Sequence, residues 1–148
     1  MKNNVKIKDD TQSLQSCVSV SVTDFRIGNL IQRNGVICTV ELINGETEEI
    51  YFLGKDFYYS DNVIYIEPIQ ITEEWLLNFG FVLYGKEATD SNSPSDWYWI
   101  KKGFKFSIDN LTYLNNQLGV KIKYVHQLQN LYFALVGSEL QISNLTEH

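Results

Sequence analysis

The segment that decides the fold is Val125–Leu135, with the sequence VHQLQNLYFAL. Its apolar residues recur at helical spacing and predict one apolar stripe, formed by Val125, Leu128, Leu131 or Tyr132, and Leu135. Gly137 stands where a residue in the left-handed conformation would end the helix. We therefore expect a helix over 125–136. Because a helix of about three turns is not stable alone, another part of the chain must cover its stripe.

The clearest strand signal lies upstream, between Phe25 and Phe52. Two Asn-Gly pairs, Asn34-Gly35 and Asn44-Gly45, separate apolar runs in this segment. Asn-Gly between such runs favours a two-residue hairpin turn, because both turn residues need a positive φ. The pattern predicts a three-stranded antiparallel meander. This meander is either the beginning of an SH3-like small barrel or a plain curved sheet.

The remaining segments predict shorter elements. We expect strands over 17–22, 63–66, 81–84, 97–100, 104–108, 111–114 and 120–123. A short helix over 73–79 should begin after Thr72 and end at Gly80. Residues 55–61 predict a loop with exposed aromatic side chains, and 85–96 a connection. The expected fold class is therefore α+β, mainly antiparallel β, with the 125–136 helix packed on a sheet.

Length and composition bound the organisation of the chain. Its 148 residues, 44% of them hydrophobic, predict one compact domain over 17–142 after a polar, flexible arm over 1–16. The net charge of −6 argues against a protein that coats DNA or RNA, since such proteins are usually basic. No apolar run approaches the ~20 residues that span a bilayer, and no signal-peptide pattern is present. We therefore expect a cytoplasmic protein without a membrane partner.

Three segments of the chain carry a resemblance to a known group of proteins. They are 24–30 (DFRIGNL), 71–81 (ITEEWLLNFGF) and 124–135 (YVHQLQNLYFAL). Together they resemble small, largely uncharacterised proteins of Bacteroidetes-type bacteria and their phages, over about residues 24–140. The resemblance implies a phage or prophage accessory protein that acts in the host cell cytoplasm. It brings no known catalytic or binding residue.

The chain lacks the residue patterns of common catalytic and metal sites. Its nine glycines stand singly, which excludes a phosphate-binding Gly-rich loop, and its scattered Cys and His lack zinc-ligand spacing. We expect the thiols of Cys17 and Cys38 to be buried or idle rather than bridged. His126 fits a helix-surface residue hydrogen-bonded to backbone, and Glu73 and Glu74 fit residues that complement a helix dipole. We therefore expect no enzyme activity, no metal and no cofactor.

Charge is distributed unevenly along the chain. Residues 41–74 contain nine carboxylates against one lysine, whereas residues 97–126 contain five lysines against one aspartate. Lysines supply charge for a phosphate, and aromatic rings supply a platform for a base. The candidate ligand-binding residues are Trp97, Tyr98, Trp99, Lys101, Lys102, Lys105, Lys121 and Lys123. Strand alternation puts Trp97 and Trp99 on one face and Tyr98 on the other, and we expect one of these faces to belong to the core.

These features favour a non-enzymatic binding protein. We expect its ligand to be an anionic small molecule, and the phage context suggests a nucleotide signal of host defence. The alternative is a structural or assembly module, or an inhibitor of a host protein, that uses complementary acidic and basic faces. In the assembly case the two faces would mate with each other in a homo-oligomer.

Overall fold

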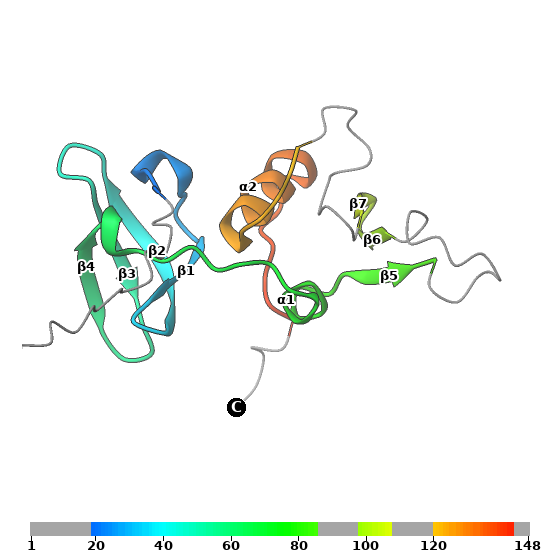
Figure 1. The fold of residues 1–148 in the computed structure, drawn as a ribbon, viewed down its shortest axis with the longest axis horizontal. Coiled ribbons are helices and arrows are strands. Elements are labelled where there is room, and N and C mark those ends of the chain that lie inside the picture. Colours follow the sequence, from blue (N-terminus) through cyan, green and yellow to red (C-terminus); the bar gives the residue numbers. More distant parts are fainter. Residues whose placement is uncertain (1–18, 86–97, 108–119, 144–148) are drawn as a thin grey trace, which may run out of the picture.

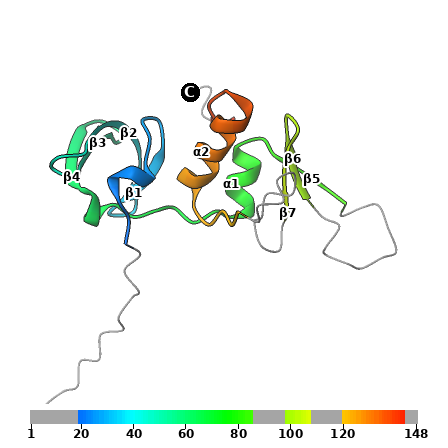
Figure 2. The same cartoon turned by 90° about the horizontal axis from the view of Figure 1, so that it is seen from above.

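The computed structural model of the chain describes residues 19–85, 98–107 and 120–143. In these ranges the chain forms two antiparallel sheets, two α-helices and two short 3-10 helices (Figure 1). The longer helix, α2 (Val125–Val136), lies between the two sheets in both views (Figures 1 and 2). The expected α+β class, with a C-terminal helix packed on a sheet, is therefore confirmed.

The first sheet belongs to residues 19–68, which we call the N-lobe. Its strands, in spatial order, are β1 (Leu30–Arg33), β2 (Val36–Asn44), β3 (Glu49–Leu53) and β4 (Tyr58–Asn62). The inward face is apolar because every second residue points to it, so that Ile31 pairs with Cys38 and Val40 pairs with Phe52. After β4 the chain forms η2 (Val63–Tyr65) and returns to β1.

That return does not complete a barrel. Gln32 of β1 and Glu67 exchange two backbone hydrogen bonds of 3.0 and 2.9 Å, and this isolated bridge is not extended into a strand. Of the two alternatives that the sequence left open, the structure therefore has the open sheet.

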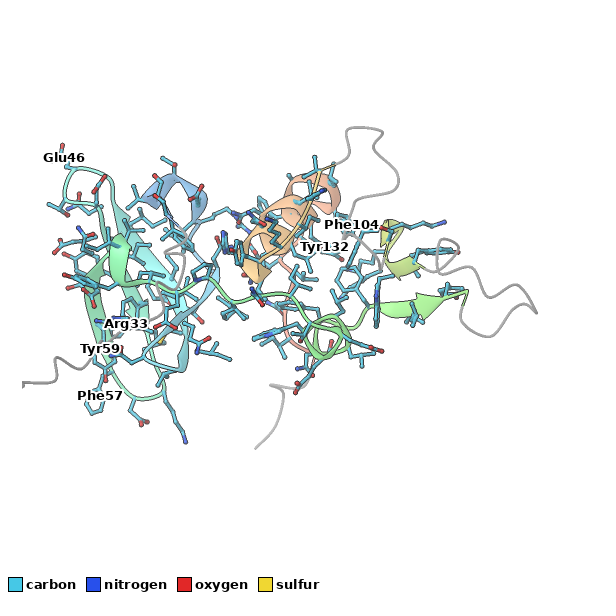
Figure 3. All side chains as sticks on the ribbon, in the orientation of Figure 1. Arg33, Glu46, Phe57, Tyr59, Phe104 and Tyr132 are labelled. Carbon is cyan, nitrogen blue, oxygen red and sulfur yellow. The ribbon has the colours of Figure 1, made fainter. Side chains whose placement is uncertain are left out.

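The second sheet belongs to the C-lobe, which comprises residues 69–85, 98–107 and 120–143. Its strands are β5 (Val82–Tyr84), β6 (Tyr98–Lys101) and β7 (Phe104–Ser107), and α1 (Glu73–Asn78) precedes them. The sheet and α2 share one core, in which the rings of Phe104 and Tyr132 lie 5.5 Å apart (Figure 3). The predicted helix over 73–79 is confirmed, and the predicted strands over 97–100 and 104–108 correspond to β6 and β7, which pair as a hairpin.

The two lobes meet where α2 faces the loop Arg26–Leu30, and we call this contact the joint. The Gln129 side chain accepts a hydrogen bond from the Leu30 N–H (2.8 Å) and donates one to the Gly28 carbonyl (3.3 Å). Asn29 donates from its side-chain amide to Asn130 Oδ1 (2.9 Å). Asn29 and Gln129 are buried, so these partners replace the water that both amides would otherwise bind.

A tight turn gives the joint loop its shape. The Asn29 N–H donates to the Arg26 carbonyl (3.0 Å), and Gly28 occupies the third turn position with φ 88°. The turn sends the Arg26 side chain back over α2, where its guanidinium lies 4.1 Å from the Phe133 ring centroid. There it forms a two-pronged ion pair with Glu139 (2.6 and 2.9 Å).

The apolar stripe of α2 differs in part from the prediction. Val125 and Leu128 are buried. Tyr132 is 1% exposed, so Tyr132 rather than Leu131 is the third buried residue of the stripe. Leu135 is 47% exposed and does not belong to the stripe. The C-lobe core lies beneath the middle of the helix, and Gly137 ends the helix in the left-handed conformation that its position predicted.

Two predicted strands are short 3-10 helices instead. Residues 19–21 form no strand, and Val22–Asp24 form η1, because the Ser21 side chain accepts from the Thr23 N–H while Asp24 accepts from the Ser21 N–H. Val63–Tyr65 form η2 in place of the strand predicted over 63–66, because the Asn62 side chain accepts from the Ile64 N–H. In both places a local polar side chain competes with strand pairing.

The prediction of a loop with exposed aromatic side chains over 55–61 is right for residues 55–57 and for the exposure, but wrong for residues 58–61. Tyr58–Asn62 form β4, whose residues pair with all of β3. The strand signal was hidden because Tyr58, Tyr59 and Ser60 are all exposed, so no apolar alternation marks them. Residues 120–123 form no regular strand: the segment is tied to its neighbour by the Ile71 N–H to Lys123 carbonyl bond (3.0 Å). The predicted arm over 1–16 and the strand over 111–114 lie outside the described residues, as does the predicted connection over 85–96 apart from Gly85.

The two Asn-Gly pairs form different turns. Asn34 and Gly35 have φ 50° and 78°, as the predicted two-residue turn requires. The β2–β3 connection is a longer loop, because the Asn44 side chain accepts hydrogen bonds from the N–H groups of Glu46 (3.0 Å) and Thr47 (3.3 Å). Its positive φ, 56°, falls on Glu48 instead of Gly45.

This difference predicts opposite outcomes for the same substitution. Gly35→Val should lower the free energy of unfolding by about 1–3 kcal/mol, because a β-branched residue fits a positive φ poorly. Gly45→Val should change it by less than about 0.5 kcal/mol, since the added side chain meets open space there. Urea unfolding of both variants measures the two values. Equal destabilisation by both would contradict the assigned turns.

Candidate functional site

The β5–β7 sheet has one core face and one outer face. Trp99, Phe104 and Phe106 point into the C-lobe core and are each at most 2% exposed. Trp99 was a predicted ligand residue, but its ring is not available at the surface. The outer face carries Tyr98, which pairs across the strands with Tyr84. The alternation predicted two faces, and packing against α2 decides which of them is buried.

Two tyrosines and a lysine gather on this outer face, and we call them the tyrosine patch. The rings of Tyr84 and Tyr98 are nearly parallel, at an interplanar angle of 7° and a centroid distance of 5.8 Å. Lys105 Nζ lies 4.9 Å from the centroid of the Tyr98 ring. Tyr84 is 53% exposed, so its ring is accessible to a ligand. The patch thus combines an accessible π-face with a cation.

Lys101 and Lys102 belong to the same hairpin as Tyr98 and Lys105 but not to the tyrosine patch. Lys101 lies on the inner side of β6 and donates a hydrogen bond from Nζ to the Phe79 carbonyl. Burial lowers the pKa of Lys101, and the neighbouring charge of Lys102 lowers it further. Lys102 lies in the β6–β7 turn with φ 47° and is exposed. Lys101 therefore supports the C-lobe core instead of facing a ligand.

The other candidate residues lie elsewhere or outside the described ranges. Lys121 and Lys123 are exposed on the segment that leads into α2 and runs beside Gln70 and Ile71. Trp97 lies outside the described residues. Of the eight predicted residues, Tyr98 and Lys105 are the two with a described contact to each other. Tyr84 was missed because it joins the patch only through the β5–β6 register, across the undescribed residues 86–97.

His126 is a buried core residue, which corrects the prediction of a helix-surface histidine hydrogen-bonded to backbone. It is 2% exposed, its Nδ1 has no hydrogen-bond partner, and its ring lies 4.7 Å from that of Phe25 and 5.7 Å from that of Tyr124. Burial lowers the pKa of His126 to about 4, although the Asp24 carboxylate opposes the shift. The imidazole is therefore neutral at pH 7 and enclosed by aromatic rings.

No metal-binding cluster appears in ranges 19–85, 98–107 and 120–143, where no three His, Cys, Asp or Glu side chains gather closely enough to hold an ion. Cys38 is a buried free thiol, as expected, and burial raises its pKa. Cys17 lies outside the described residues. Among the helices that the structure describes, none has the length and apolar character to cross a membrane.

The lowered pKa of His126 predicts that the fold weakens in mild acid. The unfolded chain binds a proton near pH 6.5 but the folded chain only near pH 4, so stability is complete above pH 6.5 and falls between these values. The difference in unfolding free energy between wild type and His126→Phe should therefore change by up to about 3 kcal/mol from pH 7.5 to 4.5. Urea unfolding at both pH values measures it, and a constant difference would show that His126 titrates normally.

Comparison with protein-family models, curated proteins and solved structures found no match to this chain.

Proposed function

We propose that the protein is a non-catalytic binding module that holds an anionic small molecule with a planar ring on the tyrosine patch. The observation that carries this proposal is the placement of Lys105 beside Tyr98, with the accessible Tyr84 ring alongside. A base or other flat ring would stack on Tyr84, and a phosphate or carboxylate would pair with Lys105. Stacking of one base on an exposed ring is worth roughly 1–3 kcal/mol.

The surroundings of the patch support an anionic ligand. The described C-lobe has five lysines against three carboxylates, and Glu139, one of the three, is paired with Arg26 at the joint. The patch lies on strands rather than on a loop, so little ordering is needed before a ligand binds. With the phage context that the sequence resemblance implies, the ligand we favour is a nucleotide signal of host defence, held without turnover.

The alternative function is assembly, or inhibition of a host protein, through complementary charged faces. One observation favours it: the N-lobe has eight carboxylates against three basic side chains, whereas residues 97–126 have five lysines against one aspartate. Such a separation steers association with an oppositely charged surface and with a second copy of the chain.

Calorimetry against mono-, di- and cyclic nucleotides tests the first proposal. We expect Tyr84→Ala to weaken nucleotide binding fivefold or more, because one stacking platform is lost. Lys105→Ala should weaken it about fivefold, whereas Lys105→Arg, which keeps the charge, should restore it. Tyr51→Ala is the matched aromatic control, since Tyr51 is a partly exposed tyrosine on the N-lobe sheet.

The outcomes separate the functions. Absence of heat across the whole panel contradicts the nucleotide proposal, as does equal weakening by Tyr51→Ala and Tyr84→Ala. New product in the same mixtures, detected by chromatography, contradicts a non-catalytic role. Light scattering at high protein concentration decides the alternative: a strict monomer argues against self-assembly.

A further inference from the structure

The N-lobe sheet curls until its two outer strands meet at one end. Arg33 lies on β1 and Asp61 on β4, the opposite edges of the sheet, yet two guanidinium nitrogens lie 2.7 and 2.6 Å from Asp61 Oδ2. A cavity of about 440 Å³ lies at this end, between the ion pair and the β3–β4 loop. Figure 3 shows Arg33, Tyr59 and Phe57 gathered there, away from Glu46 at the far end of the sheet.

Three aromatic rings line the cavity, each in contact with the next. Tyr59 pairs with Phe52 across β3 and β4, so both side chains point to the inward face, and their rings stack at 5.8 Å. Phe57, from the β3–β4 loop, meets Tyr59 nearly edge-on at 6.4 Å. Phe52 is buried, but Tyr59 and Phe57 are 50% and 65% exposed. Exposed rings at different angles offer π-faces to a group that enters the cavity.

The net charge of the N-lobe favours a cation as that group. Arg33 is neutralised by Asp61, donates to the Asn34 side chain and lies 5.6 Å from the Tyr65 ring centroid. Asp56 and Lys55, both exposed on the loop, also line the cavity and carry opposite charges, so the lining itself is balanced and the charge of the whole lobe decides. In the described N-lobe both arginines, Arg26 and Arg33, are engaged in ion pairs while carboxylates outnumber basic side chains by eight to three. The net field is therefore negative.

We propose that this cavity binds the side chain of a lysine or arginine presented by an extended segment of a partner protein. Aromatic faces attract such cations through the ring quadrupole, and the acidic lobe raises their local concentration. An anion would find Lys55 in the lining, but Arg33 is already paired and the lobe as a whole carries net negative charge. The cavity lies in the N-lobe and would bind a cation, whereas the tyrosine patch lies in the C-lobe and would bind an anion. The two proposals can therefore be tested independently.

Nuclear magnetic resonance titration of the isotopically labelled full chain tests the site. The probe is a blocked pentapeptide, Gly-Ser-Arg-Ser-Gly, and its versions with Lys, Glu or Leu at the centre are compared with it. The Arg and Lys peptides should shift the amide signals of residues 54–61 in a saturable manner, and the Glu and Leu peptides should not. Because the interaction is partly with exposed charge, higher salt should weaken it.

Single-ring variants assign the binding to the cavity. Phe57→Ala and Tyr59→Ala should each weaken Arg-peptide binding about threefold, the value expected for one exposed cation–π contact. Tyr58→Ala is the matched control: it removes a 73% exposed tyrosine from the same strand, but from the opposite face, and should change binding by less than about twofold. Phe57 lies in a loop, so its removal tests the site even if Tyr59→Ala does not fold.

Four results would overturn the proposal. They are absence of any shift with the Arg peptide, equal or tighter binding of the Glu or Leu peptide, and equal weakening by Tyr58→Ala and Phe57→Ala. The fourth is movement of the 54–61 signals with protein concentration alone, which would assign the cavity to a second copy of the chain.

Discussion

The rest of the structure depends on the pair of hydrogen bonds that Gln129 makes with the backbone of Gly28 and Leu30. Each lobe has its own apolar cluster, and the two clusters are separate. The lobes are held together by this buried polar contact, by Asn29, Asn130 and the Arg26–Glu139 ion pair, and by the packing of Leu30 on the C-lobe cluster and of Phe25 on His126. A buried amide that loses its partner costs about 1–3 kcal/mol, so this contact tolerates little change in geometry.

The joint connects two lobes with dissimilar surfaces. The acidic N-lobe presents an aromatic cavity, and the C-lobe presents the tyrosine patch on its sheet. His126 lies beside the joint against Phe25 and is neutral at pH 7, so protonation in acid would place a buried charge between the lobes. A protein that binds two partners of opposite charge would gain from such a joint, because it connects the site for one partner to the site for the other.

How far the sequence predicts this structure depends on how local each signal is. The bounds of α2 were predictable because its apolar spacing and Gly137 lie in one short stretch. The joint was not, because Gln129 reads as the polar side of an amphipathic helix and its partners lie about 100 residues away. The tyrosine patch was predictable only in part: Tyr98 and Lys105 share a hairpin, but Tyr84 joins them through a distant register.

The most direct test of the joint is amide hydrogen exchange in Gln129→Ala. The Leu30 N–H donates to Gln129 Oε1, whereas the Gln32 N–H donates to Glu67 within the N-lobe. If Gln129 holds the lobes together, the substitution should speed exchange at Leu30 about tenfold or more, at ~1.4 kcal/mol per decade, and leave Gln32 nearly unchanged. Exchange at Leu30 as slow as in the wild type would contradict the account.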